Sequence, residues 1–243
     1  MRIANWNVDH ARQAWRREAL QSQMRGVNAD VWILTETHAS LNPGSEYRWV
    51  ARSQPSDELC DAESWVSIWS RMPMLDELKT TDSTFSAGAT FKLGDGTPLT
   101  VFGTVLPWRG REWGGHPSAG AVAFEAAVRR QQTDWALASQ DPRRAICVAG
   151  DFNQDLSTKS YYWSRKAYDV LRAMLTESGL TAATADPTDP VRRLTGGTSA
   201  CIDHICLSQA LTTKLTAPSE AWSPVVNSRA LSDHHGIYID IDC

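Results

Sequence analysis

Eight polar residues that follow short apolar runs have the chemical types needed for metal and phosphate chemistry. In chain order they are Asn7, Asp9, Glu36, Asp151, Asn153, Asp203, Asp233 and His234. Five of the eight are carboxylates, and they come from five separate segments. So many anions can share one pocket only if a hard cation holds them there. The sequence therefore predicts a metal-dependent hydrolytic site.

Short strands and a few helices are expected to position these side chains. Period-two alternation and short apolar runs predict strands at residues 2–8, 31–34, 47–52, 65–70, 84–92, 99–106, 145–149, 202–207 and 237–241. Helical spacing of apolar residues predicts helices at residues 124–138 and 165–178. A polar, arginine-rich stretch without glycine or proline until Gly26 predicts a helix at residues 11–27, although its apolar face is blurred. Strands that are partly adjacent and partly separated by helices indicate a mixed α/β protein.

Turn residues divide the middle of the chain. Residues 93–98 read Leu-Gly-Asp-Gly-Thr-Pro and predict a hairpin between the two strands that flank them. The segment at residues 107–120 is rich in glycine and proline and predicts a long irregular loop.

Strand geometry predicts how the polar pairs face. Because successive strand side chains alternate, Asn7 and Asp9 should point the same way, as should Asp151 and Asn153. Both pairs lie where an apolar strand gives way to a loop, and sites in open α/β sheets collect at such ends. Gly150 would allow the backbone to bend or a ligand to approach closely before Asp151.

Length and charge limit the classes of protein. The 243 residues, 42% of them hydrophobic, can bury a large core. We expect one domain over residues 1–243, because the site draws on both ends of the chain. The net charge of −4 argues against general, nonspecific nucleic-acid binding, so phosphate contacts must come from local basic groups and a metal.

The cysteines and the hydropathy pattern bear on the compartment. The five cysteines form no CxxC pair, which favours reduced, buried thiols over a disulfide framework. No run approaches the roughly 18 apolar residues of a membrane span. We expect a cytoplasmic protein with no obligate protein partner.

Six motifs in order resemble the endonuclease/exonuclease/phosphatase superfamily, especially the exonuclease III-like AP endonucleases and their deoxyribonuclease I-like relatives. They are NWNVD, LTETH, VSIWSRMPM, GDFNQD, IDHICLS and SDHHG, and they cover nearly the whole chain. A single such motif is a weak signal, but six in order are a strong one. The resemblance implies a four-layer sandwich of two mixed β-sheets flanked by helices.

The resemblance also implies roles for the eight residues. Glu36 and Asn7 would be metal ligands, with Asp9 and Asp233 in or beside the first coordination shell. Asp151 is similar to the aspartate that activates the attacking water, and Asn153 to the amide that holds the phosphate. His234 would contact the scissile phosphate, with Asp203 fixing its tautomer. Mg²⁺ suits this oxygen-rich set, and Mn²⁺ is expected to substitute.

The chain departs from the family where AP endonucleases carry a tyrosine and deoxyribonucleases a histidine. Residues 105–108 read Val-Leu-Pro-Trp, with no ionisable group. The missing contact could come from Arg109, Arg111 or His116 in the same loop, and Trp108 is a further candidate substrate-binding residue.

Several residues have an ordinary structural interpretation beside the functional one. His204 neighbours Asp203 on a strand and is expected to be a hydrogen-bonded core residue, and His10, His38 and His235 have no evident role. Tyr162 belongs to an aromatic and basic patch that could stack bases, although packing beneath the next helix explains the aromatics almost as well.

Three functions are compatible with these residues. The first is a Mg²⁺-dependent phosphodiesterase acting on nucleic acid, with DNA favoured. The second is a phosphatase or phosphodiesterase for a phosphoinositide, sphingomyelin or a small phosphorylated metabolite. The third, a non-catalytic module, does not explain why every expected metal and phosphate position is chemically intact.

Overall fold

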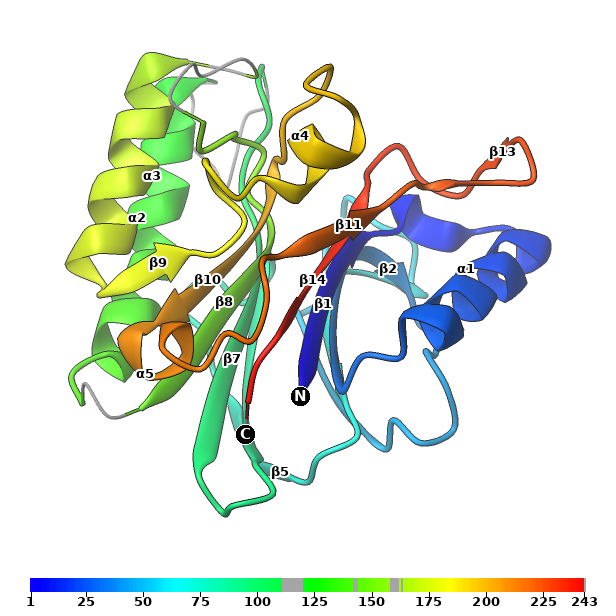
Figure 1. The fold of residues 1–243 in the computed structure, drawn as a ribbon, viewed down its shortest axis with the longest axis horizontal. Helices are drawn as coiled ribbons and strands as arrows, with labels where there is room; N and C mark the ends of the chain where they lie inside the picture. The colour runs from blue at the N-terminus through cyan, green and yellow to red at the C-terminus, as the bar shows by residue number, and fades with distance from the viewer. Residues whose placement is uncertain (111–119, 142–143, 158–161, 163, 243) are drawn as a thin grey trace.

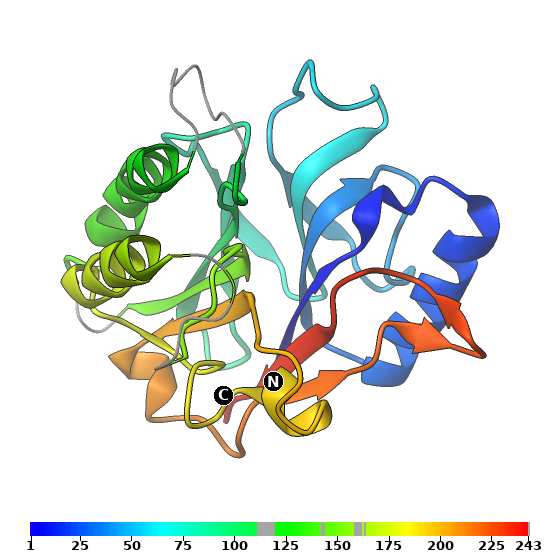
Figure 2. The ribbon, with the colours of Figure 1, turned by 90° about the horizontal axis from the view of Figure 1, so that it is seen from above.

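Two six-stranded sheets pack face to face between helices in the computed structural model (Figures 1 and 2). The structure describes residues 1–110, 120–141, 144–157, 162 and 164–242. The prediction of a four-layer α/β sandwich is confirmed: helix α1 covers one outer face, and helices α2 and α3 cover the other.

The first sheet holds both ends of the chain. Its strand order is β11-β14-β1-β2-β4-β3, with β1 parallel to β2 and antiparallel to β14. The strands are β1 (Arg2–Asn7), β2 (Val31–His38), β3 (Trp49–Arg52), β4 (Glu63–Ser70), β11 (Glu220–Trp222) and β14 (Gly236–Asp240).

The second sheet has the order β5-β6-β7-β8-β10-β9. Its strands are β5 (Met74–Leu78), β6 (Ser86–Lys92), β7 (Pro98–Val105), β8 (Ala145–Asp151), β9 (Leu180–Ala182) and β10 (Asp203–Ser208). Strands β6 and β7 pair antiparallel across residues 93–97, which confirms the predicted hairpin. A separate two-stranded hairpin joins β12 (Val225–Val226) and β13 (Arg229–Ala230).

The helices follow from capping and apolar spacing. They are α1 (Ala14–Val27), α2 (Ala121–Ala138), α3 (Arg165–Glu177), α4 (Pro190–Leu194) and α5 (Gln209–Thr212), with a 3-10 turn η1 at Asp9–Ala11. Ser164 caps α3 by accepting a hydrogen bond from the Ala167 N–H, an arrangement typical of helix starts. Of the helices in the described part of the chain, none is long and apolar enough to cross a membrane.

Alternation along β1 separates two cores. Ala4 and Trp6 belong to the smaller core beneath α1, whereas Ile3 belongs to the larger core that lies between the sheets and under α2 and α3. Asn5 and Asn7 follow Ile3 at period two and therefore face the second sheet. The sheets approach closely here: a Cβ on Gly103 of β7 would lie 2.4 Å from Val66 Cγ1 of β4.

Candidate active site

A partly buried histidine lies between two aspartates from the second sheet. His234 Nδ1 lies 2.7 Å from Asp203 Oδ2, and its Nε2 lies 4.0 Å from Asp151 Oδ2. Asp151 ends β8 and Asp203 begins β10, and the two residues are register partners in the sheet. Antiparallel pairing thus places both carboxylates side by side, although the residues are 52 positions apart in the chain.

The first sheet brings His234 to this pair. Ser232 donates a hydrogen bond from its hydroxyl to the Asn7 carbonyl at 2.6 Å and accepts one from the His234 N–H at 3.0 Å. Trp6 Nε1 donates to the His234 carbonyl at 3.0 Å. These bonds attach the SDHH segment to the end of β1, which orients the imidazole towards β8 and β10.

Glu36 and Asp151 are joined by the Asn7 side chain. Its amide nitrogen donates to Glu36 Oε1 at 3.0 Å and to Asp151 Oδ2 at 3.2 Å, while its Oδ1 accepts from the Asp9 N–H at 2.9 Å. An amide N–H group donates and does not coordinate a cation. In this structure Asn7 therefore spaces the two carboxylates, and its direct ligation of a metal stays a prediction.

A left-handed backbone conformation at Glu36 directs its side chain into the site. Normal alternation along β2 would place Glu36 on the α1 side with Trp32 and Leu34, which lie in the smaller core. Its φ of 47° breaks this alternation and turns the carboxylate towards Asn7. Such a conformation costs on the order of 1–3 kcal/mol for a residue with a Cβ, and strain of this kind clusters at functional sites.

Asn153 lies beside Asp151 because the chain turns tightly after β8, and not because the two residues share one face of a strand. Its φ is 47°, its backbone N–H donates to Asp151 Oδ1 at 2.9 Å, and its side-chain nitrogen donates to Asp151 Oδ2 at 3.0 Å. Position 150, directly before Asp151, must be glycine, because a Cβ there would lie 1.9 Å from the Thr104 carbonyl oxygen.

The charges in this cluster perturb one another. Burial, together with the charges of Asp203 and Glu36, raises the pKa of Asp151 to about 7, against the lowering effect of His234. Burial would lower the pKa of His234, but the Asp203 and Asp151 carboxylates outweigh it and hold that pKa well above its usual value. The structure thus favours an imidazolium facing a carboxyl group that can exchange a proton near neutral pH.

Two of the predicted metal ligands lie at the edge of this cluster. The Asp9 carboxylate accepts a hydrogen bond from Arg16 Nη2 at 2.7 Å and is about half exposed. Asp9 belongs to η1 with a φ of 44°, so the expectation that it faces the same way as Asn7 by strand alternation is wrong. Asp233 is exposed beside His234. For both residues metal ligation stays a prediction.

The predicted substrate-binding residues are placed unevenly. Trp108 and Arg109 line a cleft next to the cluster, and Tyr162 donates from its hydroxyl to Asn153 Oδ1 at 3.3 Å. Arg111 and His116 lie outside the described residues.

Sequence reasoning missed His10 as a neighbour of the site. Its Nε2 lies 3.2 Å from Glu36 Oε2, and its Nδ1 lies 3.5 Å from Glu63 Oε2. The hydrogen bond to Glu36 raises the pKa of His10 despite its partial burial. Burial would raise the pKa of Glu36, but hydrogen bonds from His10 and Asn7 outweigh it and lower that pKa. Nothing in the sequence signalled the left-handed turn that brings His10 to β2.

Asn5 was also missed, although a signal for it exists. Its side-chain nitrogen donates to Asp203 Oδ1 at 3.2 Å and lies 3.4 Å from the Gly150 carbonyl oxygen. An amide two residues before Asn7, on the strand face that should be apolar, could have been read as part of the site. His204, in contrast, is the buried residue that was expected, between Thr184 Oγ1 at 3.0 Å and the Gln154 carbonyl at 2.9 Å.

The profile of the Endonuclease/Exonuclease/phosphatase family matches residues 4–234 of the chain. The chain belongs to this family. Members of the Endonuclease/Exonuclease/phosphatase family are phosphoric ester hydrolases that depend on divalent metals. No curated protein sequence matches the chain at a significant level.

Solved structures show that the family fold extends over the whole chain. An AP endonuclease from Archaeoglobus fulgidus superposes with a TM-score of 0.72 at 16% identity, over 100% of both chains. A 3′ phosphatase from Neisseria, bound to a product DNA hairpin, gives a TM-score of 0.70 at 15% identity over 100% of both chains. The endonuclease domain of the telomere-specific non-LTR retrotransposon TRAS1 gives 0.67 at 14% identity, over 99% of this chain and 97% of that one. At these identities the likeness shows the fold alone.

The donor set suits the divalent cation that the family uses. Glu36, Asp151 and Asp203 present carboxylate oxygens to one small region, and their mutual repulsion is one cause of the raised pKa of Asp151. A divalent cation would relieve that repulsion, and oxygen ligands are those that Mg²⁺ prefers. A beta toxin from Staphylococcus aureus with the same fold has been solved with bound magnesium ions, at a TM-score of 0.63 and 15% identity over 99% of both chains.

The hydrogen bonds that the donor atoms already make indicate where a cation fits. Asp151, Asp203 and His234 bring three donor atoms within 4.8 Å of one another. His234 Nδ1 is already hydrogen-bonded to Asp203, however, and an imidazolium repels a cation. Glu36 lies outside this group of three: its Oε1 accepts from the Asn7 amide, and its Oε2 lies 3.2 Å from His10 Nε2. The carboxylate that fits a metal best is therefore that of Glu36.

Proposed function

We propose that this protein is a Mg²⁺-dependent phosphodiesterase that hydrolyses phosphodiester bonds in nucleic acid, with DNA favoured over RNA. The observation that carries the proposal is the convergence of Glu36, Asp151, Asp203 and His234 from both sheets into one cluster. Mn²⁺ is expected to replace Mg²⁺.

Each side chain has a task in ester hydrolysis. Asp151, with a pKa of about 7, is suited to accept the proton of a water molecule that attacks phosphorus. The imidazolium of His234, 4.0 Å away, would stabilise the negative charge that develops on the phosphate oxygens. A bound divalent cation supplies Lewis-acid polarisation of those oxygens and charge neutralisation.

The neighbouring side chains would hold these groups in place. Asp203 keeps Nδ1 of His234 hydrogen-bonded, so that Nε2 is the atom that faces Asp151 and the substrate. Asn153 donates to Asp151 and orients its carboxylate. Holding groups at a fixed geometry before the reaction is a large part of the catalysis of phosphoryl transfer.

Nucleic acid is favoured by what surrounds the cluster. Trp108 and Arg109 line the adjacent cleft, and Tyr162 donates to Asn153. Aromatic and cationic groups together suit a polyanion that carries flat bases. Similar solved structures include an AP endonuclease and a phosphatase bound to a DNA hairpin. The net charge of −4 predicts weak, salt-sensitive binding focused on the site.

The test is incubation of the purified protein with plasmid, abasic duplex, single-stranded DNA and RNA in Mg²⁺, Mn²⁺ or EDTA. We expect cleavage of at least one nucleic acid that requires the metal. Hydrolysis of inositol phosphates, sphingomyelin or mononucleotides, with no cleavage of any polymer, would reject the nuclease and support the small-phosphoester alternative.

A further inference from the structure

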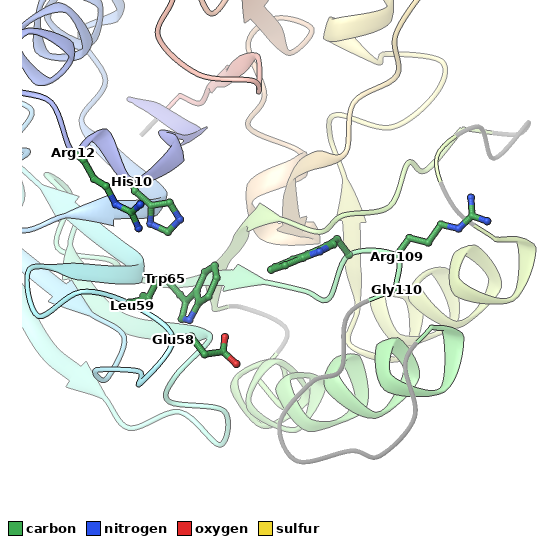
Figure 3. Close-up of a pocket in the computed structure, with 8 residues that line it drawn as sticks. His10, Arg12, Glu58, Leu59, Trp65, Arg109 and Gly110 are labelled. Atoms are coloured by element: carbon green, nitrogen blue, oxygen red, sulfur yellow. The ribbon is translucent and has the colours of Figure 1, made fainter.

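An open cleft lies at the junction of the two sheets, beside the cluster formed by Glu36, Asp151, Asp203 and His234 (Figure 3). Its volume is about 720 Å³, and it is lined by residues that follow β1, by residues before and within β4, and by residues that follow β7. His10 belongs to its wall, and the same imidazole lies 3.2 Å from Glu36. A molecule in the cleft is therefore separated from Glu36 by a single side chain.

The inner wall of the cleft is aromatic and rigid. The rings of Trp65 and Trp108 have centroids 6.2 Å apart and are tilted by 47°. Trp65 is only 4% exposed and also packs against Phe85 at 5.5 Å and His10 at 6.1 Å. Trp108 is partly exposed, and Leu59 adds an aliphatic surface. A flat ring that is held firmly from behind is a good stacking platform, because little side-chain entropy is lost on binding.

Two arginine side chains lie at the rim of the same cleft. Arg12 is fixed by Glu63, with Nε at 2.5 Å from Oε1 and Nη2 at 3.0 Å from Oε2, yet 58% of its side chain is exposed. Arg109 is exposed at the rim, and in Figure 3 it lies on the opposite side of the cleft from Arg12. Glu58 is the carboxylate at this rim. An aromatic wall with arginines at its edges matches a flat base that is attached to phosphates.

We propose that this cleft is a subsite for the nucleobase of the nucleotide next to the scissile phosphate, with the base stacked on Trp108. The proposal rests on the nuclease function proposed above and adds that the protein binds the neighbouring nucleobase as well as the phosphate. Because every base has a flat face, the subsite requires a base without selecting its sequence. The protein should then act poorly on phosphoesters that lack a base at this position.

The experiment measures equilibrium binding to the metal-free protein, so that it does not depend on turnover. A short fluorescent single-stranded oligonucleotide and the same oligonucleotide with tetrahydrofuran abasic residues are titrated in EDTA and followed by anisotropy. We expect the abasic oligonucleotide to bind about 5- to 100-fold more weakly to the wild-type protein, the range that corresponds to the stacking of one base.

Variants assign the effect to the cleft. Trp108→Ala should weaken binding of the base-bearing oligonucleotide by about 5- to 100-fold and leave binding of the abasic one unchanged. Trp108→Phe keeps a flat ring and should retain most of the affinity, which separates stacking from a folding defect. Trp15→Ala is the matched control, because Trp15 is 46% exposed on α1 and does not line the cleft.

Three results would overturn the subsite. They are equal binding of the two oligonucleotides by the wild-type protein, equal weakening of both by Trp108→Ala, and no measurable binding of the base-bearing oligonucleotide at millimolar concentration. The nuclease proposal fails on a different measurement, which is the absence of metal-dependent cleavage. A protein that cleaves nucleic acid but shows no effect of base removal would keep the function and lose the subsite.

Discussion

His234 Nδ1 and Asp203 Oδ2 lie 2.7 Å apart across the junction of the two sheets. Asp203 begins β10 of the second sheet, whereas His234 is attached through Ser232 to the end of β1 in the first. The contact exists only when both sheets are packed together. Assembly of the site is therefore coupled to formation of the core between the sheets.

Asp203→Asn should lower the pKa of His234 and reduce turnover. Burial alone would lower that pKa, and the Asp203 carboxylate is the largest charge that opposes it. We expect a loss in kcat on the order of 100-fold, because the neutral imidazole no longer stabilises charge at the phosphate. NMR titration of His234 in both proteins checks the pKa, and an unchanged titration would show that Asp203 does not control it.

Glu36→Gln should weaken binding of the divalent metal. An amide oxygen carries no net charge, so the cluster loses one of the anions that attract the cation. We expect Mn²⁺ affinity to fall at least 10-fold in isothermal titration calorimetry. Glu46→Gln is the control, since Glu46 pairs with Arg71 at 3.0 Å on the surface. Equal affinities for all three proteins would place the metal elsewhere.

His10→Ala should weaken metal binding indirectly. The imidazole contacts Glu36 on one side and Glu63 on the other, and groups that orient a metal ligand contribute about 10- to 100-fold in affinity. His10→Gln, which can still donate a hydrogen bond to Glu36, should recover part of the loss. His38→Ala is the matched control, because His38 Nδ1 accepts from the Ser40 N–H instead. A loss in His38→Ala as large as that in His10→Ala would contradict the positioning role.

The contribution of Asp151 to the stability of the metal-free protein should fall as the pH rises from about 4 to 8. Folding raises the pKa of Asp151 to about 7, so the folded state holds this proton more tightly than the unfolded state does. The resulting stabilisation is complete at low pH and is lost as the pH rises through the folded pKa. The raised pKa of His234 acts in the same direction, and its contribution is lost only at higher pH.

Asp151→Asn should remove the part of this dependence that belongs to Asp151. The neutral amide imitates the protonated acid, so above pH 7 the metal-free variant should be more stable than the wild-type protein by on the order of 1–4 kcal/mol. Urea denaturation at pH 5 and pH 8 measures the difference. Parallel pH profiles for the two proteins would show that the Asp151 carboxyl is not perturbed by folding.

Much of the fold could be predicted from local patterns. The apolar runs that became β1, β8 and β14 and the helices α2 and α3 are visible in the sequence because each buries one face or both. Strand β5 was not predicted, since Leu75, Asp76 and Glu77 are exposed at the edge of the second sheet and carry no alternation. The blurred apolar face of residues 11–27 reflects the 3-10 turn before α1, after which Leu20, Met24 and Val27 form the buried face.

The site could be predicted in its residue types but only partly in its geometry. Asp151, Asp203 and His234 were identified by motif, and the structure brings them together. The side-chain directions expected from strand alternation do not hold at Glu36, Asn153 and the three residues of η1, because all of them adopt positive φ. A non-glycine residue in that conformation follows from tertiary packing, which overrides the local preference of the sequence.

The proposed nuclease site is tested most directly by the rate of Mg²⁺-dependent nucleic acid cleavage by the wild-type protein and by Asp151→Asn, measured side by side with an EDTA control. Asp169→Asn provides a matched change at an exposed aspartate that pairs with Arg165 on α3. We expect metal-dependent cleavage by the wild-type and Asp169→Asn proteins and a loss of at least about 1,000-fold in Asp151→Asn. Cleavage by Asp151→Asn at the wild-type rate would contradict the proposed site.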